Sequence, residues 1–219
     1  MYSQAIEDYL REIYELQDLV GPVATGALAE QLGIAPASVT GMVKKLAEMK
    51  LVTYAPYQGV ILTAAGRKIA LEVLRHHRLI ERFLAEALGV PWDRVHEEAH
   101  KIEHVLSADL AERMDVLLGR PATDPHGAPI PRADGTIEAS ARLRLAELAA
   151  GQTAVVTEVS DGNAELLRYL GELGLYPGTQ VSILAVAPLD RLMTIRVGGA
   201  QHAVSQAVAG EVFVTDVIL

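Results

Sequence analysis

The first third of the chain carries apolar residues at helical spacing. They recur every three or four positions between Ser3 and Leu19, which predicts an amphipathic helix. Two shorter helices are predicted next, at 24–32 and 36–46. Gly33 separates them, because glycine tolerates the positive φ of a helix C-cap. Two short helices joined by a tight turn are typical of a helix-turn-helix, and also of an ordinary hairpin in a helical core.

The residues that follow favour the helix-turn-helix. Residues 51–54 and 60–63 are β-prone runs, and residues 55–59 between them have the composition of a turn. A hairpin directly after the second helix is typical of a wing, and the combination is much more specific than either part. We therefore expect residues 1–63 to be a winged helix-turn-helix that binds double-stranded DNA.

Candidate DNA contacts lie on the outward face of the second helix and in the turn of the wing. The helix begins with small and polar residues that can approach base edges, and two lysines follow one turn later for phosphates. The wing residues could contact the phosphate backbone or be ordinary loop residues. The expected set is Ala37, Ser38, Thr40, Gly41, Lys44, Lys45, Tyr57 and Gln58.

Residues 64–119 predict a second, helical domain. A long helix capped by Thr63 runs to about Leu88, and Ser107 caps a last helix that runs to Leu118. The apolar surface of this segment exceeds what one small helical layer would hide. We therefore expect a symmetric homodimer, which would read a palindromic operator.

The remainder divides into a linker and a β domain. Residues 120–141 are rich in Pro and Gly and predict little regular structure. Residues 142–219 hold several short β-prone runs and one short helix at 165–172, which suggests a small barrel. We therefore expect a mainly α protein with a small all-β domain. The predicted strands are 153–159, 180–187, 192–197, 201–205 and 211–217.

Charge and composition restrict the kinds of binding partner and metal site that the protein can have. The net charge of −9 argues against a generally basic nucleic-acid coat. Residues 1–68 are nearly neutral, whereas residues 69–119 hold 10 acidic against 6 basic residues and most of the histidines. There is no cysteine, so thiolate metal sites and disulfides are excluded. With no signal peptide and no long apolar run, we expect a cytoplasmic protein without a membrane span.

The stretch HEEAHKIEH, at 96–104, is the strongest chemical signal. At about 100° per residue of an α-helix, His96, His100, Glu103 and His104 share a wedge of roughly 100°. Borderline divalent cations bind imidazole nitrogen and carboxylate oxygen of this kind. The helix rises about 12 Å along this stretch, so the wedge predicts two sites. A helix that happens to be rich in solvated histidines remains the alternative.

Other candidates are ambiguous on spacing alone. His77 and Glu81 are four residues apart on the long helix, which favours a salt bridge over a metal clamp. Asp8 adjoins the apolar stripe of the first helix and is a surface aspartate by default. We interpret the remaining histidines as structural or surface residues; these are His76, His126 and His202.

The order of these motifs resembles the diphtheria-toxin-repressor family of iron- or manganese-dependent transcriptional regulators. The resemblance covers essentially the whole chain, and its most specific parts are RHHRLIERFL, VHEEAHKIEHVLS and PHGAPIP. It implies that metal binding orders a dimer whose winged helices then bind operator DNA. It also implies that the C-terminal domain is an SH3-like barrel of the FeoA type.

The resemblance implies two metal sites. The primary site matches Asp8, His100, Glu103 and His104. The ancillary site matches His77, Glu81 and His96, and is completed from the barrel by Glu158 and Asp161 of the segment TEVSDG.

Departures from the family pattern bear on the metal. Iron-sensing members carry methionine and cysteine where this chain has Asp8 and His100, and soft sulfur ligands favour iron. Manganese-sensing members have aspartate at the first position. Many of them have glutamate in place of His100 and a second acidic residue in place of Arg11. We expect Mn²⁺ as the activating ion with Fe²⁺ as the alternative, and binding of Zn²⁺ or Cd²⁺ in vitro.

We therefore expect a metal-dependent repressor of metal-homeostasis genes, not an enzyme, without a small organic substrate. One alternative is a dinuclear metallohydrolase, because histidine and carboxylate clusters also build catalytic sites. Another is a metal-independent DNA-binding protein that uses its barrel as an effector module.

Overall fold

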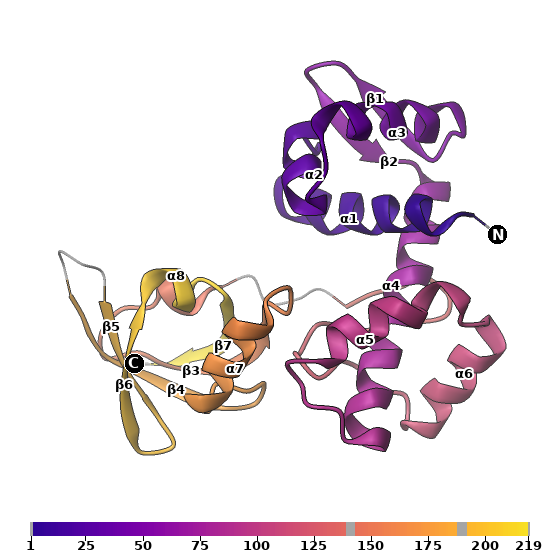
Figure 1. The fold of residues 1–219 in the computed structure, drawn as a ribbon. Coiled ribbons are helices and arrows are strands. Elements are labelled where there is room, and N and C mark those ends of the chain that lie inside the picture. Colours follow the sequence, from indigo (N-terminus) through magenta and orange to yellow (C-terminus); the bar gives the residue numbers. More distant parts are fainter. Residues whose placement is uncertain (1, 139–142, 188–191, 219) are drawn as a thin grey trace. The chain divides into compact units, whose positions relative to one another are not determined.

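The computed structural model describes residues 2–138, 143–187 and 192–218 (Figure 1). The predicted start of the last domain at 142 and the side chain of Leu19 lie outside the described residues. The chain forms two compact units. Unit 1 comprises residues 1–76, 103–106 and 131–136, and unit 2 comprises 77–102, 107–130 and 137–219.

Unit 1 contains the winged helix-turn-helix that the sequence predicts. Gly33 adopts the left-handed conformation, with a φ of 64°, and so allows the tight turn between the second and third helices. The two strands pair as an antiparallel hairpin. The elements are α1 (Gln4–Val20), α2 (Thr25–Leu32), α3 (Pro36–Glu48), β1 (Val52–Ala55) and β2 (Gly59–Leu62).

The first helix is part of the core of this domain. Leu10 and Ile13 of α1 are fully buried, as are Leu28 of α2 and Leu46 of α3. The wing is also attached to α1, since the side-chain carbonyl of Gln17 accepts a 2.8 Å hydrogen bond from the backbone N–H of β2. Helix α1 also packs against α2, so a displacement of α1 would disturb both α2 and the wing.

The middle of the chain is helical, as predicted, with one correction. Helix α4 (Ala64–Leu88) begins after Thr63, whose hydroxyl accepts a hydrogen bond from a first-turn N–H, and it continues into unit 2. Helix α5 (Val95–Ile102) is shorter than the predicted helix. A 3₁₀ turn, η1 (Glu103–Val105), follows it, and α6 (Ala108–Leu117) comes next. The prediction that Glu103 and His104 continue the α-helix is therefore wrong. Helix ends often tighten into 3₁₀ geometry, as this one does.

Residues 120–141, which the sequence predicts to be a linker, include buried side chains in their described part. This part has no helix or strand, only a bridge between Thr123 and Pro129. Three features attach its first part, residues 120–130, to the rest of unit 2. His126 is fully buried, and the carbonyl of Pro129 accepts a 2.6 Å hydrogen bond from Arg78. A Cβ on Gly127 would lie 1.9 Å from the carbonyl oxygen of Thr157, so only glycine fits there.

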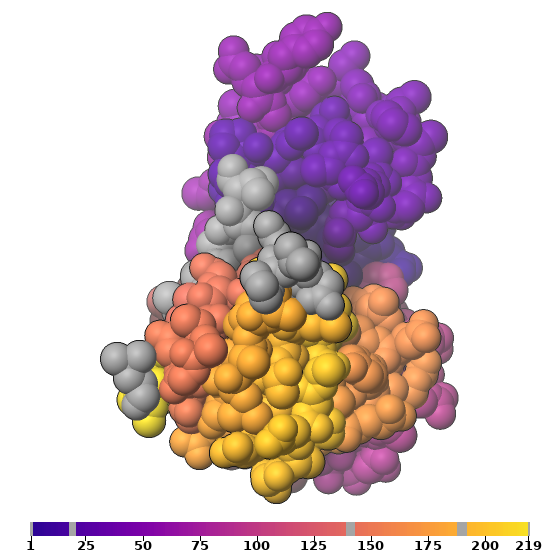
Figure 2. Space-filling view, turned by 90° about the vertical axis from the view of Figure 1, so that its left-hand side faces the viewer, coloured from indigo at the N-terminus to yellow at the C-terminus, as the bar shows by residue number. Residues whose placement is uncertain are grey.

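The C-terminal domain is an antiparallel sheet with strand order β6-β5-β4-β3-β7. Its strands are β3 (Thr153–Val159), β4 (Gln180–Val186), β5 (Leu192–Val197), β6 (Ala200–Ser205) and β7 (Val212–Ile218). Its helices are η2 (Leu145–Glu147), α7 (Ala164–Glu172) and α8 (Gln206–Ala209). The sequence did not predict η2 or α8, which are each a single turn. The domain presents a continuous orange-to-yellow surface in Figure 2.

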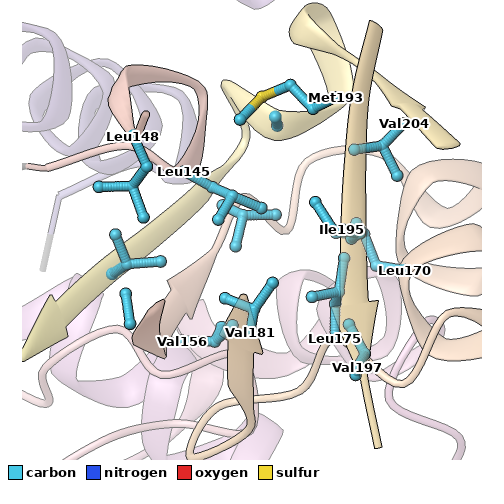
Figure 3. Packing of buried hydrophobic residues seen from close by; sticks show 14 of the residues in the cluster. Leu145, Leu148, Val156, Leu170, Leu175, Val181, Met193, Ile195, Val197 and Val204 are labelled. Carbon is cyan, nitrogen blue, oxygen red and sulfur yellow. The ribbon is translucent and has the colours of Figure 1, made fainter. Parts of the chain in front are cut away.

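Aliphatic side chains fill the interior of this domain. Leu145, Val156, Leu170, Val181 and Ile195 are essentially inaccessible to solvent, and they point into one cluster in Figure 3. Alternating burial along β3, β4 and β5 matches the period of two in their sequences. No helix of the described residues is long and apolar enough to cross a membrane.

Candidate metal centres

The first candidate centre joins α1 to the turn η1. Nε2 of His104 lies 2.9 Å from Oδ1 of Asp8 and 3.2 Å from Oε1 of Glu103. His100 belongs to the last turn of α5, directly before η1. Its donor atom and those of the other three all lie within 4.8 Å of one another. These are the four residues that the resemblance assigns to the primary site.

The chemistry of this group suits a divalent cation. It offers two carboxylates and two imidazoles, which are ligands for borderline metals. Oδ1 of Asp8 is buried without a hydrogen bond, a situation that is unfavourable unless another group compensates it. A cation bound among these donors would supply that compensation.

Arg11 adds a permanent positive charge to this centre. Its Nη1 lies 3.1 Å from both carboxylate oxygens of Glu103, and both side chains are buried. Burial lowers the pKa of Arg11, but the charges of Glu103, Glu15 and Glu12 outweigh it and raise the pKa. The guanidinium therefore stays charged and offsets part of the negative charge. From the sequence alone, Arg11 is only a departure from a family pattern.

Glu7 is a contact that the sequence analysis missed. Its Oε2 lies 2.7 Å from Nδ1 of His104, opposite the nitrogen that faces Asp8. Glu7 and Asp8 are consecutive residues of α1. The available signal was only the pair of adjacent acids, which does not distinguish a metal-site residue from a surface one.

The second candidate centre lies in unit 2. Oε1 of Glu81 is 2.9 Å from Nε2 of His77 and 3.1 Å from Nδ1 of His96. Nδ1 of His96 is also 3.3 Å from Oδ2 of Asp161, which follows β3. Donor atoms of these four residues lie within 4.8 Å of one another. Glu158, which the resemblance also assigns here, joins no such group among the described residues.

A second set of donors shares two members with this centre. Glu81 and Asp161 also group with Asp124 and His126, again within 4.8 Å. The sequence pattern favours a structural or surface role for His126 and does not point to Asp124. The signal was in PHGAPIP, which served there only as a family motif. Both residues come from the segment expected to be a linker.

His126 is oriented as a metal ligand would be. Its Nε2 lies 2.8 Å from the carbonyl oxygen of Trp92, which can only accept, so Nε2 carries the hydrogen. Its Nδ1 is buried without a hydrogen bond, 4.0 Å from Glu81 Oε1 and 3.9 Å from Asp161 Oδ2. The ring of Trp92 lies beside that of His126, with centroids 5.7 Å apart.

Other buried atoms of this set also make no hydrogen bond, although Oδ2 of Asp124 lies 3.6 Å from Nε of Arg78. Oε2 of Glu81 and Oδ2 of Asp124 are buried without a hydrogen bond. The other oxygen of Asp124 accepts from the backbone N–H groups of His126 and Ala128. Since buried polar groups are normally hydrogen-bonded, these atoms fit a bound divalent cation.

Burial and neighbouring charges shift the pKa values of several residues in this centre. Burial raises the pKa of Glu81, but the charge and hydrogen bonds of His77 and His96 outweigh it and lower the pKa to about 2. Burial lowers the pKa of His96, but its hydrogen bonds to Asp161 and Glu81 raise it to about 10. For Asp124, burial and the charge of Glu81 raise the pKa well above its ordinary value.

The expected DNA-contacting residues are mostly at the surface. Ala37, Ser38, Gly41, Lys44 and Lys45 of α3 are exposed. Thr40 is half-buried, and its hydroxyl donates to the carbonyl of Pro36. In the turn of the wing Tyr57 is fully exposed at a φ of 65°, and Gln58 is exposed beside it.

A winged helix-turn-helix followed by helices that hold two candidate cation centres defines a class of protein, the DNA-binding regulators with internal metal sites. Three family models match successive parts of the chain. They are described as "Iron dependent repressor, N-terminal DNA binding domain" over residues 1–60, "Iron dependent repressor, metal binding and dimerisation domain" over 63–132, and "FeoA domain" over 143–216.

Full-length relatives agree with these matches. The chain is 34% identical over 192 residues to the iron-dependent repressor IdeR of Mycobacterium tuberculosis, covering 81% of this chain and 82% of the relative. The protein therefore belongs to the diphtheria-toxin-repressor family of metal-dependent transcriptional repressors. This confirms the resemblance and the fold class expected from the sequence.

Two solved structures are similar over nearly the whole chain. A manganese-dependent transcriptional repressor in complex with manganese superimposes with a TM-score of 0.90 and 35% identity, covering 95% of this chain and 98% of the other. The repressor ScaR with bound Cd²⁺ superimposes with a TM-score of 0.84 and 33% identity, covering 96% of this chain and 98% of the other.

The raised pKa of His96 predicts a pH dependence of folding in chelator. A histidine whose pKa rises on folding from 6.5 to about 10 stabilises the folded state. This contribution to the free energy of unfolding is fully present below pH 6.5 and is lost as the pH rises through about 10. The difference in unfolding free energy between the unchanged protein and His96→Gln should therefore shrink from pH 6.5 to pH 10. Urea unfolding at a series of pH values measures it, and a difference that grows over this range would contradict the assignment.

Proposed function

We propose that the protein is a homodimeric, cytoplasmic repressor of metal-homeostasis genes, whose binding to palindromic operator DNA is activated by Mn²⁺. The proposed segments are a DNA-binding domain at 1–63, a metal-binding and dimerisation domain at 64–119, a connecting segment at 120–141 and a barrel at 142–219. The proposed primary ligands are Asp8, His100, Glu103 and His104.

The observation that carries this proposal is the position of Asp8. It lies on α1, the helix whose Leu10 and Ile13 are buried in the core and whose Gln17 binds the wing. A cation held by Asp8 together with the residues of η1 would fix α1 and, through it, α3 and the wing. Metal binding would thereby favour one arrangement of the DNA-binding elements.

The donor set supports Mn²⁺. It contains oxygen and nitrogen but no sulfur, and sulfur ligands would favour iron. One similar structure is described as a manganese-dependent repressor with manganese, while the mycobacterial relative is described as iron-dependent. Fe²⁺ is therefore the alternative ion. Structures of ScaR with Cd²⁺ and Zn²⁺ support the expectation that these ions bind in vitro.

The proposed dimer surface lies on α6. Leu110, Val116 and Leu117 are large apolar residues with between 46% and 70% of their surface exposed. The family model that covers this helix is described as a dimerisation domain. Apolar side chains so exposed on one short helix favour burial against a second copy of the chain.

Metal-dependent DNA binding tests the main proposal. The probe is a duplex selected by the Mn²⁺-loaded protein from a random library, and its affinity is measured by fluorescence anisotropy. Mn²⁺ should raise the affinity at least tenfold over chelator, and the DNA should raise the Mn²⁺ affinity by the same factor. Asp8→Ala should remove this dependence, and Glu97→Ala, at an exposed residue of α5, should preserve it. Equal affinity with Mn²⁺ and with chelator refutes the proposal.

The ancillary ion has two candidate donor sets, both containing Glu81 and Asp161. The resemblance implies His77 and His96 with Glu158. Asp124 and His126, however, each have a buried side-chain atom that makes no hydrogen bond, which favours those two residues. We propose the second set. His126→Ala should then bind one Mn²⁺ fewer per chain in a calorimetric titration, and His96→Ala should not. The opposite result would support the set implied by the resemblance.

Contacts from α3 to phosphates predict a change in salt dependence. The logarithm of the affinity for duplex DNA falls with log[salt] by about 0.9 for each phosphate contact. Replacing both Lys44 and Lys45 by Ala should reduce this slope by about 2 per bound chain. Lys68→Ala, at an exposed lysine outside α3, is the control. An unchanged slope in the double variant would show that these lysines do not contact phosphate.

The two alternative functions, a metallohydrolase and a metal-independent DNA-binding protein, predict different experimental results. A dinuclear metallohydrolase would turn over phosphoesters with bound metal, whereas the relatives reported above are described as repressors. A metal-independent DNA-binding protein would keep its regulation when Glu103 or His104 is replaced by Ala. The proposed function predicts no turnover and loss of regulation in both variants.

A further inference from the structure

The imidazole of His104 lies between two carboxylates from consecutive residues of α1. Nδ1 is 2.7 Å from Oε2 of Glu7, and Nε2 is 2.9 Å from Oδ1 of Asp8. Asp8 belongs to the group of candidate ligands, whereas Glu7 does not. Glu7 therefore contacts a candidate ligand without being one itself, and the proposed function gives it no role.

The two nitrogens of an imidazole have different tasks when the ring binds a metal. The nitrogen that binds the metal must present a lone pair, so the hydrogen of the neutral ring resides on the other nitrogen. A carboxylate can only accept a hydrogen bond, so Glu7 favours the tautomer with hydrogen on Nδ1. That tautomer leaves the lone pair of Nε2 directed toward Asp8 and Glu103.

The surroundings make this contact strong. The side chains of Glu7 and His104 are 14% and 9% exposed, so water competes weakly for either group. A charged acceptor in such a site makes a short hydrogen bond of about twice the ordinary strength. The separation of 2.7 Å between Nδ1 of His104 and Oε2 of Glu7 agrees with a charge-assisted bond of this kind.

We propose that Glu7 is a positioning residue of the primary metal centre, which holds His104 as the Nδ1–H tautomer with Nε2 toward the ion. The inference rests on the proposed function, since it concerns the same centre. Two consecutive residues of α1 would then contact the ring of His104. Asp8 would bind the ion on the Nε2 side, and Glu7 would hold the opposite nitrogen, Nδ1. Partners of this kind typically change metal affinity 10–100-fold when they are removed.

A purely structural salt bridge between α1 and η1 is the rival explanation. It would affect thermal stability, but neither the tautomer of the bound ring nor the metal affinity of the folded protein. Glu7→Gln distinguishes the two explanations, because glutamine keeps the shape and one acceptor oxygen but loses the charge. Glu7→Ala loses both.

The first experiment measures Mn²⁺ affinity at this centre alone. All variants carry Glu81→Gln, which removes one of the two carboxylates common to both other donor groups. Affinity is measured by competition with a metallochromic chelator. Glu7→Ala should weaken Mn²⁺ binding by 10–100-fold and Glu7→Gln by a smaller factor, while Glu97→Ala stays within twofold. If Glu7→Ala and Glu7→Gln both stay within twofold, the inference is wrong.

The second experiment needs no substitution at Glu7. The protein is labelled with ¹⁵N-histidine and loaded with Zn²⁺, which is diamagnetic, and the ring nitrogens of His104 are assigned by NMR. Nδ1 should show the shift of a protonated nitrogen and Nε2 that of a metal-bound one. The reverse assignment overturns the inference, even if Glu7→Ala fails to fold.

Failure of the proposed function would have a different signature. In that case Asp8→Ala, in the same Glu81→Gln background, would bind Mn²⁺ as well as its parent does. If instead Asp8→Ala abolishes binding and the Glu7 variants leave it unchanged, only the role of Glu7 is refuted.

Discussion

The buried carboxylate of Glu103 is the constraint on which the contact between α1 and η1 depends. With only 1% of its surface exposed, it would be several kcal/mol unfavourable if it stood uncompensated. Arg11 compensates it through both oxygens without any metal, so α1 and η1 are already joined by a charge pair. A bound cation would therefore reinforce an existing contact and make its geometry more definite.

The centre in unit 2 is compensated in a different way. Its carboxylates belong to Glu81, Asp124 and Asp161, and Arg78 lies 3.6 Å from Asp124. The imidazole of His96, whose pKa is raised to about 10, supplies a titratable positive charge beside Glu81 and Asp161. Several of the buried atoms make no hydrogen bond. The first centre thus holds a permanent positive charge, whereas the second depends on a proton that a divalent ion would replace.

The sequence predicted what depends on local pattern and missed what depends on contacts between elements. The helix-turn-helix and the wing follow from apolar spacing and Gly33, and both are present in the fold. The predicted positions of the side chains of HEEAHKIEH depend on one continuous α-helix. The pattern of residues does not reveal the 3₁₀ turn that begins at Glu103. The burial of Arg11 and the contact of Glu7 arise where α1 meets a turn some 90 residues later, and no local periodicity encodes that. The sequence does not reveal the role of His126, because the segment that carries it lacks helix or strand and its composition predicts a linker.

The position of Trp92 gives the molecule an internal optical reporter. It is the single tryptophan of the chain, so emission excited at the red edge of the spectrum arises from one place. The ring of Trp92 lies beside the rings of both His126 and Tyr176, and its centroid is 4.6 Å from that of Tyr176. Fluorescence of the unmodified protein therefore reports on the neighbourhood of His126, without a dye or an engineered label.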